Sequence, residues 1–329
     1  MIQIDGSIGG GQLLRTSLSL SAITQKPFRI INIRGKRENP GLQKQHLTAV
    51  NAILEICNAK VKGNELHSTE LEFIPSKVIS KNYKFDIGTA GSTTLVAQTL
   101  IPTLITADKS SIIEIIGGTA NPLAPPALDV KEVFLYHLEN IGIEVNLEIE
   151  REGFYPKGNG KITLKINPCR EIKFKIIRPE DENVYLFAVC SEELKDREIC
   201  NRMIKGFKLN FPMNYKIGAE EKHIDPLSPG CYIHSNYKKF GMSILGEKSK
   251  KAEDVGKECA LNLLKEIKSN ADTDHFTADQ LLLYLGISGK GKIKVSQITN
   301  HMKTNIEIIE KFLDVKFEIK DNIIECCKK

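Results

Sequence analysis

The sequence lacks any run of apolar residues long enough to cross a bilayer. Its first residues, Met1 to Asp5, have neither the basic start nor the apolar middle of a secretory signal peptide. Aromatic residues make up only 6% of the chain and charged residues 26%, which points to an ordinary globular protein. We therefore expect a cytosolic (cytoplasmic) protein with no membrane partner.

The eight cysteines show no CxxC pair and no compact spacing. Disulfide-stapled domains and zinc ribbons depend on such spacing, so we expect reduced thiols, mostly in the core. The net charge of +5 at pH 7 is too small to indicate a polyanionic partner by itself. The position of the cations therefore matters more than their total.

The elements recur along the chain in the order strand, helix, strand, helix, strand, strand. With 329 residues, the chain is long enough for two domains. The first unit is expected to have strands at 1–5, 28–33, 59–61 and 70–74 and helices at 12–23 and 41–57. The second is expected to have strands at 83–87, 112–116, 144–150 and 161–166 and helices that begin near Ser92 and at Pro125-Pro126.

The third unit is interrupted. Its opening strand is expected at 171–177, but its first helix, at 279–285, comes about a hundred residues later, before a strand at 292–298. The residues between have their own pattern, with strands at 184–189, 215–219 and 232–245 and helices at 193–207 and 251–267. We predict an α/β (α+β) fold: a main body of three repeated βαβαββ units, residues 1–179 and 270–329, with a smaller inserted α/β domain, residues 180–269.

His301 lies between the last predicted strand and the last predicted helix. Thr304 followed by Glu307 is a capping-box pattern, so this helix should begin at about Asn305, just after the histidine. Backbone N–H groups at a helix N-terminus favour an anion, and a neutral histidine beside it can attack a phosphorus atom and form a phosphoramidate. A lone loop histidine is more often a surface or hydrogen-bonding residue, so this pattern leaves both interpretations open.

Two further stretches could bind phosphate. In the glycine-rich stretch 5–15, the backbone can approach a phosphate closely, and Gln12 and Arg15 add donors, although a plain tight turn explains it equally well. This stretch matches neither GxGxxG nor the P-loop pattern. In 34–46, three cations precede a helix, which suits phosphate recognition or a solvated basic loop. These cations are Arg34, Lys36 and Arg37.

Two other stretches could bind a nucleobase. The proline-rich loop 117–126 could stack against a base or simply redirect the chain. Phe276 to Gln280 offer an aromatic ring and polar groups at a helix start, where capping and packing are the plainer explanation. Every nucleotide-site candidate lies outside the insert, so we expect the insert to take no part in the nucleotide chemistry.

Together these stretches resemble the RNA 3'-terminal phosphate cyclases, over essentially the whole chain and most weakly in the insert. The matching residues, in order, are Gly9 to Arg15, Arg34 to His46, Gly88 to Ser92 with Gln98, Gly117 to Thr119 with Asn121-Pro122 and Pro125-Pro126, Gly153 to Pro156, Ala278 to Gln280, and His301 with Thr304-Asn305. That family has a body of repeated βαβαββ units and a smaller inserted domain, in agreement with the pattern above.

The resemblance implies an enzyme, a ligase that converts an RNA 3'-phosphate into a 2',3'-cyclic phosphodiester with ATP. His301 would be the catalytic residue that attacks the α-phosphorus of ATP, releases pyrophosphate and carries AMP. The RNA 3'-phosphate would then take the AMP, and the neighbouring 2'-hydroxyl would close the ring and expel AMP. The partner is RNA with a 3'-terminal phosphate.

The resemblance also implies site residues. ATP would be bound by Gln12, Arg15, Gln98, Pro125, Pro126, Phe276, Thr277, Ala278, Asp279 and Gln280, with Phe276 and a proline as candidates to sandwich the adenine. The RNA phosphate would be held by Arg34, Arg37, Gln45 and His46. A Mg²⁺ or Mn²⁺ ion should neutralise the triphosphate.

One departure concerns this metal. The family motif usually reads Gly-Glu-Gly-Gly-Gly-Gln, and its glutamate helps to hold the metal, but Gly9-Gly10-Gly11-Gln12 is shorter and contains no glutamate. Asp5 is the nearest carboxylate in sequence. The metal ligands are thus unassigned, and triphosphate and waters could hold the ion.

Two alternatives stay open at this point. The family includes a relative in ribosomal-RNA maturation that lacks the catalytic histidine, so a non-catalytic RNA-binding role is the first. An enolpyruvyl-transferase-like enzyme is the second, because repeated βαβαββ units also build those enzymes. The sequence does not specify the oligomeric state and is compatible with a homodimer.

Overall fold

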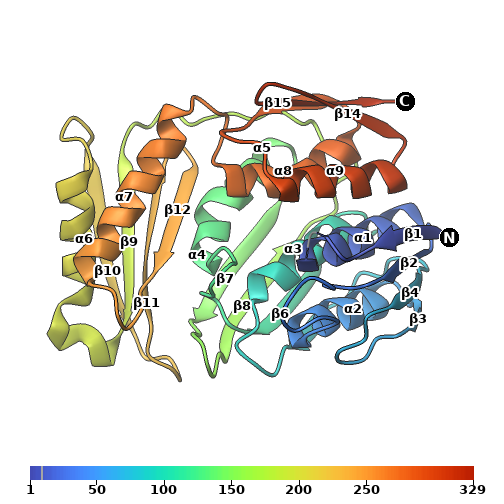
Figure 1. Cartoon of the computed structure of the whole chain (residues 1–329), viewed down its shortest axis with the longest axis horizontal. Coiled ribbons are helices and arrows are strands. Elements are labelled where there is room, and N and C mark those ends of the chain that lie inside the picture. Colours follow the sequence, from blue (N-terminus) through green and yellow to red (C-terminus); the bar gives the residue numbers. More distant parts are fainter. Residues whose placement is uncertain (9) are drawn as a thin grey trace.

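The first βαβαββ unit forms a four-stranded sheet with two helices. The computed structural model describes residues 1–8 and 10–329 (Figure 1); Gly9 of the glycine-rich motif lies outside the described residues. Strand β1 pairs with β2 in parallel, and the other pairings are antiparallel. The sheet order is β1 (Ile2–Asp5), β2 (Phe28–Ile31), β4 (Leu71–Ile74) and β3 (Lys60–Lys62), with helices α1 (Gly10–Thr24) and α2 (Lys44–Ile56).

The second unit repeats this order. Its sheet contains β5 (Tyr83–Asp86), β6 (Ser111–Gly117), β8 (Gly160–Ile166) and β7 (Val145–Arg151), with helix α3 (Thr93–Leu104). Its second helix begins after Pro126, as predicted, and contains α4 (Ala127–Asp129), a π-helical turn (Val130–Phe134) and α5 (Leu135–Asn140). The predicted α/β class is therefore confirmed.

The third unit has helices α8 (His275–Ser288) and α9 (Asn300–Phe312) and a sheet ordered β13 (Gly291–Lys294), β15 (Ile323–Lys328) and β14 (Val315–Lys320). The sheets of the first two units place their strands in the order first, second, fourth, third. The third sheet has the same order but lacks the first strand. The predicted strand at 171–177 is wrong: Ile172 is buried, but the Lys173 N–H donates to the Ile141 carbonyl rather than to a neighbouring strand. The predicted strand at 292–298 is also too long, because β13 ends at Lys294.

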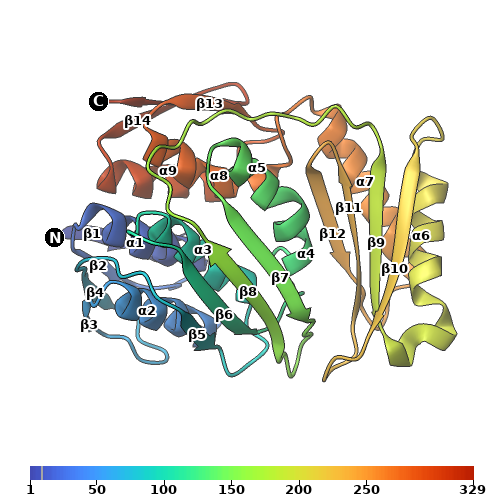
Figure 2. The same cartoon turned by 180° about the vertical axis from the view of Figure 1, so that it is seen from behind.

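Residues of the insert form the fourth sheet. Its order is β10 (Ile217–Ile224), β9 (Val184–Ser191), β11 (Cys231–Tyr237) and β12 (Phe240–Leu245), and helices α6 (Ile199–Asn210) and α7 (Ala252–Lys268) cover one face (Figure 2). The single strand predicted over 232–245 is a hairpin, because Lys238 and Lys239 adopt positive φ angles of 49° and 62° and reverse the chain. A separate buried cluster around Phe207 and Leu263 fills the space between this sheet and its helices.

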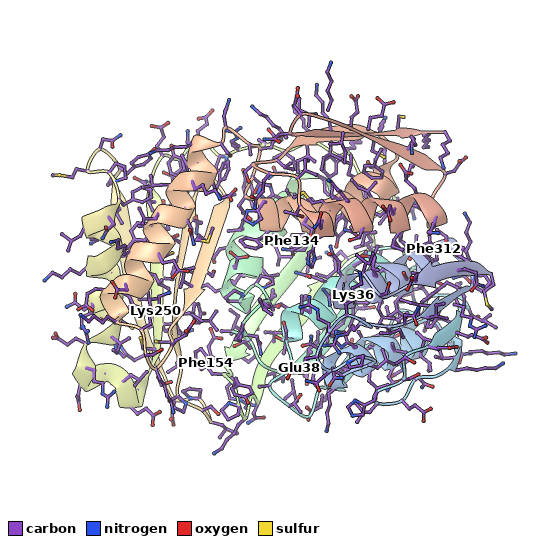
Figure 3. All side chains as sticks on the ribbon, in the orientation of Figure 1. Lys36, Glu38, Phe134, Phe154, Lys250 and Phe312 are labelled. Carbon is purple, nitrogen blue, oxygen red and sulfur yellow. The ribbon has the colours of Figure 1, made fainter. Side chains whose placement is uncertain are left out.

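One hydrophobic core joins the three units of the body. Helices α1, α3, α8 and α9 pack at its centre, and Phe28 of the first sheet meets Phe312 of α9 edge-on at 6.0 Å between ring centroids (Figure 3 labels Phe312). Because α1 lies against α9, residues from the two ends of the chain can share one site. No helix in the described part of the chain is both long and apolar enough to span a membrane.

A buried histidine joins the body to the insert and predicts an acid-sensitive stability. The His137 Nε2–H of α5 donates to the Lys239 carbonyl of the hairpin at 3.2 Å, and burial lowers the pKa of His137 to about 4. Because the pKa of His137 is lower in the folded than in the unfolded protein, the stability contributed by its neutral ring is fully present above about pH 6.5. The free energy of unfolding then falls by about 1.4 kcal/mol for each pH unit as the pH decreases towards the folded pKa. Urea unfolding of wild type and His137→Gln at pH 7 and pH 5 should show a smaller pH dependence in the variant. Equal pH dependence would contradict this assignment.

Candidate active site

A cavity of about 600 Å³ lies where the three units of the body meet strand β12. This volume suits a small-molecule ligand such as a nucleotide. The predicted site residues that line it are Gln12, Arg15, Arg37, Gln98, Pro125, Pro126, Phe276, Asp279, Gln280 and His301. They come from α1, α3, α8, α9 and two loops, so the fold brings together residues that are distant in sequence.

His301 lies inside the first turn of α9 rather than ahead of it. The helix begins at Asn300, with Thr299 as the N-cap, whose hydroxyl accepts the Met302 N–H at 3.1 Å. The predicted cap, Thr304, is wrong, because its hydroxyl donates to the Asn300 and His301 carbonyls at 3.0 Å. The His301 side chain is exposed to the cavity, next to first-turn N–H groups that have no partner inside the helix.

A hydrogen-bonded chain fixes the imidazole of His301. The Gln12 Nε2 amide donates to Asp279 Oδ2 at 3.0 Å, and Gln12 Oε1 lies 2.7 Å from His301 Nδ1. The Gln12 NH₂ group therefore faces Asp279, and its carbonyl oxygen, which only accepts, faces the histidine. Nδ1 then carries the proton, and Nε2 keeps a free lone pair.

The charged side chains next to these hydrogen bonds, Asp279 and Arg15, are only partly exposed. Burial raises the pKa of Asp279, while hydrogen bonding from Gln12 and the nearby His301 and Arg15 oppose the rise. Burial lowers the pKa of Arg15 to about 10, so its guanidinium is still charged at neutral pH. Asn305 completes the arrangement: it donates to the Asp279 carbonyl at 3.3 Å and accepts from the Thr16 hydroxyl at 2.8 Å. Asn305 is not among the site residues predicted from the sequence, although it lies in a matched motif.

The glycine-rich turn brings its backbone close to two cations and a histidine. A Cβ on Gly11 would lie 2.3 Å from His46 Nε2 and 2.9 Å from an Arg15 nitrogen, so only glycine fits there. Burial, with Arg15 and Arg34 nearby, lowers the pKa of His46 to about 3 and keeps it neutral. Arg37 reaches over the same turn and lines the cavity.

Five predicted residues do not line the cavity but shape its walls. Arg34 donates to the Asn39 and Gly41 carbonyls at 2.5 and 2.9 Å and thereby holds the basic loop. Gln45 accepts the Ser92 N–H at 2.9 Å, and His46 Nδ1 accepts the Gln43 N–H at 3.3 Å. Thr277 and Ala278 are buried in the first turn of α8.

The opposite end of the cavity is apolar and flat. Phe276 is 56% exposed, and the centroid of its ring lies 3.9 Å from the centroid of the His275 ring. Pro125 and Pro126 line the cavity together with Leu123, a 95% exposed side chain that the sequence analysis missed. Gln98 and Gln280 are joined by a 2.5 Å hydrogen bond between their amides. A planar apolar group could lie between the aromatic ring and the prolines.

The insert supplies one wall of this cavity. Gly241, Met242, Ser243 and Leu245 of β12 line it, and the Gly241 N–H donates to Asp274 Oδ2 at 2.9 Å. The site residues predicted from the sequence all lie outside these residues. Only the tertiary arrangement brings β12 to the body, and no motif in 240–245 indicates this position.

The carboxylates offer limited metal-binding capacity. Three of them, Asp129, Asp274 and Asp279, line the cavity. Burial raises the pKa of Asp129 well above its usual value, and Asp274 already accepts two backbone N–H groups. Asp279 Oδ1 is buried, has no hydrogen-bond partner among residues 1–8 and 10–329, and could bind a cation. Asp5 does not line the cavity; it accepts from Ser7 and Asn32.

Comparisons with known proteins agree with this geometry. Residues 7–319 match the family model described as RNA 3'-terminal phosphate cyclase. A relative from Pyrococcus furiosus with the same description is 41% identical over 99% of this chain and 97% of its own length. Relatives so described from Sulfolobus acidocaldarius and Korarchaeum cryptofilum are 42% and 36% identical and cover 97% and 98% of this chain and 97% and 95% of their own lengths.

Proposed function

Because the chain belongs to the RNA 3'-terminal phosphate cyclase family, we propose that it converts an RNA 3'-phosphate into a 2',3'-cyclic phosphodiester, using ATP and releasing AMP and pyrophosphate. The mechanism rests on one observation, the two hydrogen bonds that link Asp279 to Gln12 and Gln12 to His301. They leave the Nε2 lone pair of the histidine free at the N-terminus of α9.

In the first step, His301 Nε2 attacks the α-phosphorus of ATP. The new bond is N–P, and the bond that breaks joins the α-phosphorus to the bridging oxygen of pyrophosphate. The ring gains positive charge as the bond forms, and the Nδ1–H···Oε1 hydrogen bond to Gln12 stabilises that charge. First-turn N–H groups of α9 and the partly exposed Arg15 stabilise the negative oxygens.

In the second step, an oxygen of the RNA 3'-phosphate displaces histidine from phosphorus and takes the AMP. In the third, the neighbouring 2'-hydroxyl oxygen attacks the activated 3'-phosphorus, its proton passes to solvent, and AMP leaves with the bridging oxygen. A free phosphate oxygen is a poor leaving group, whereas AMP leaves readily. This difference explains why ATP is consumed.

The adenine fits between Phe276 and the prolines Pro125 and Pro126, and Gln98 and Gln280 offer amide groups near its edge. Mg²⁺ or Mn²⁺ would neutralise the triphosphate. Asp279 Oδ1 is the candidate protein ligand, with phosphates and waters as the others. The test of the function is to incubate a 3'-phosphorylated oligonucleotide with protein and ATP: the end should become resistant to phosphatase, and an end that stays sensitive would contradict the proposal.

We further propose that residues 180–269 are an inserted domain whose strand β12 closes the cavity. A separate sheet and a separate buried cluster support this division. The cytosolic location and homodimer suggested by the sequence stay predictions.

The basic loop supports a division of labour between ATP and RNA. Arg37 lines the cavity and is exposed, and a forked guanidinium can hold a terminal phosphate at two points. Arg37→Ala should therefore lower kcat/KM for 3'-phosphorylated RNA by about 10- to 100-fold at low salt. The difference from the wild type should become smaller at higher salt, because a protein with one phosphate contact fewer depends less on salt. AMP labelling without RNA should fall much less.

The matched control for that variant is Lys36→Ala, which removes a neighbouring cation that does not line the cavity (Figure 3 labels Lys36). It should change both steps little. Equal losses of labelling and cyclisation in Arg37→Ala would place this residue on the ATP triphosphate instead.

A further inference from the structure

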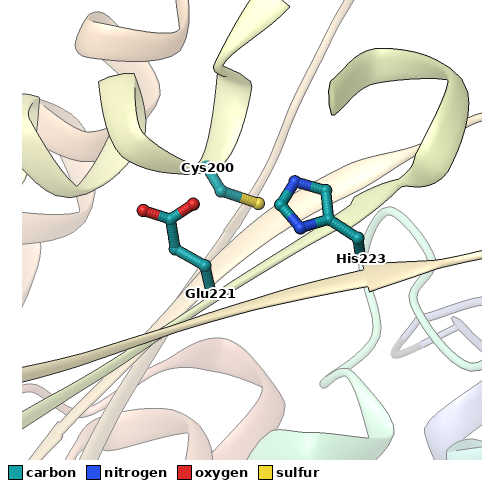
Figure 4. A group of neighbouring side chains, drawn as sticks. All are labelled: Cys200, Glu221 and His223. Carbon is teal, nitrogen blue, oxygen red and sulfur yellow. The ribbon is translucent and has the colours of Figure 1, made fainter. Parts of the chain in front are cut away.

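Three side chains with different ligand atoms converge in the insert, at the edge of its sheet. The sulfur of Cys200, a carboxylate oxygen of Glu221 and a ring nitrogen of His223 all lie within 4.8 Å of one another. Figure 4 shows the Cys200 sulfur between the Glu221 carboxylate and the His223 ring. None of the three lines the cavity described above. The nucleotide chemistry therefore gives no reason for this cluster.

The local structure explains why the three side chains meet. Glu221 and His223 are two residues apart on β10, so they project from the same face of the strand. Cys200 is in the first turn of α6, which packs over that face. Strand β10 is the edge strand of its sheet, and Glu221 is exposed. An ion can therefore reach the cluster from solvent.

The sulfur is held in place, and the carboxylate is free to move. Cys200 is only 1% exposed, and its thiol lies 3.4 Å from the Ala188 carbonyl of β9. In a tetrahedral zinc site, with bonds of about 2.0 to 2.3 Å, ligand atoms lie about 3.3 to 3.8 Å apart. The 4.8 Å limit exceeds these separations by about 1 Å, and rotation of the exposed Glu221 side chain and of the partly exposed His223 ring can close this difference.

We propose that Cys200, Glu221 and His223 form a binding site for zinc or a similar thiophilic divalent cation. A thiolate, an imidazole and a carboxylate are the ligand types that zinc prefers, whereas Mg²⁺ and Ca²⁺ prefer oxygen alone. On binding, the Cys200 thiol releases its proton to solvent and the ion gains a sulfur ligand. Water completes the coordination on the exposed side.

The proposed site differs from the prediction that the cysteines of this chain bind no zinc. That expectation came from the absence of CxxC spacing, but here the ligands come from a helix and a strand that meet only in the fold. A bound ion would tie α6 to the edge strand β10. Because the unfolded chain does not hold the three ligands together, binding should stabilise the insert.

The experiment uses the full-length protein, freed of metal with a chelator and kept in a reducing buffer. Zn²⁺ should bind with one equivalent per chain in competition with a chromophoric chelator, and should raise the melting midpoint by several degrees. Co²⁺ should give a sulfur-to-cobalt charge-transfer band. Cys200→Ser should remove this band, and Cys200→Ser and His223→Gln should each weaken Zn²⁺ binding by at least about 100-fold.

The matched control is Cys327→Ser, which removes an exposed cysteine of β15 and should leave binding unchanged. If Cys200→Ser does not fold, His223→Gln and Glu221→Gln decide the question. Failure of the wild type to take up Zn²⁺, or equal binding by wild type and the ligand variants, would overturn the site. No ATP or RNA is present, so this result is independent of the proposed cyclase activity.

Discussion

His301→Ala should reduce labelling of the protein by α-labelled ATP by roughly 10³-fold or more, because the nucleophile that would carry AMP is removed. The fold should not suffer, since the side chain is exposed at the start of α9 and, within the described part of the chain, its hydrogen-bond partner is Gln12. Binding of ATP should survive, because Phe276, the prolines and Arg15 are intact. Labelling is measured by gel after denaturation, and binding is measured by calorimetry.

The control for this variant is His67→Asn, at an exposed histidine outside the cavity whose φ angle of 65° asparagine tolerates. Its labelling should equal that of the wild type. Persistent labelling of His301→Ala would assign the nucleophile to another residue. Loss of labelling in both variants would indicate that the chemistry is not specific to His301.

Asp279→Asn should slow AMP labelling by roughly 10²- to 10⁴-fold, although it removes no group that touches the reacting phosphorus. An asparagine can donate to Gln12 Oε1, so the Gln12 amide can turn and present its NH₂ group to His301 Nδ1. The proton then moves to Nε2, the atom that must attack. The maximal rate should fall more than the apparent affinity for ATP, as expected for a residue that positions the nucleophile.

Thermal unfolding tests whether Asp279→Asn labels slowly only because the protein is destabilised. Burial disfavours the charged form of Asp279, so the asparagine variant should be no less stable than the wild type. Asp314→Asn, at an exposed aspartate remote from the cavity, is the matched control and should be fully active. Normal labelling by Asp279→Asn would show that the hydrogen-bonded chain does not set the tautomer.

Ten of the residues predicted from the sequence line the cavity, but the position of His301 relative to its helix differs from the prediction. Two threonines, Thr299 and Thr304, could cap the last helix, and only the second has the capping-box glutamate. The helix nevertheless begins at Asn300, with Thr299 as its N-cap, because Met302, Asn305 and Ile306 are buried by neighbouring helices. Burial of these side chains, rather than the capping-box pattern, thus determined where the helix begins.

Two predicted strands and the position of β12 also differ from the prediction because they depend on tertiary contacts. Residues 171–177 alternate like a strand, and the alternation reports real burial of Ile172, yet no ladder forms there. Residues 232–245 contain no glycine or proline at the hairpin turn, so Lys238 and Lys239 gave no turn signal. The contribution of β12 to the cavity could not be found in the sequence, since it depends on how the insert packs on the body.

The most direct test is to locate the AMP. Wild-type protein incubated with ATP and a divalent metal, without RNA, is digested under alkaline conditions, and the peptide that carries the added mass of AMP is sequenced by mass spectrometry. The proposed mechanism predicts one modified residue, His301, in a bond that is labile to acid and stable to alkali, as expected of a phosphoramidate. AMP on a lysine, on a carboxylate, or on a different histidine would contradict it.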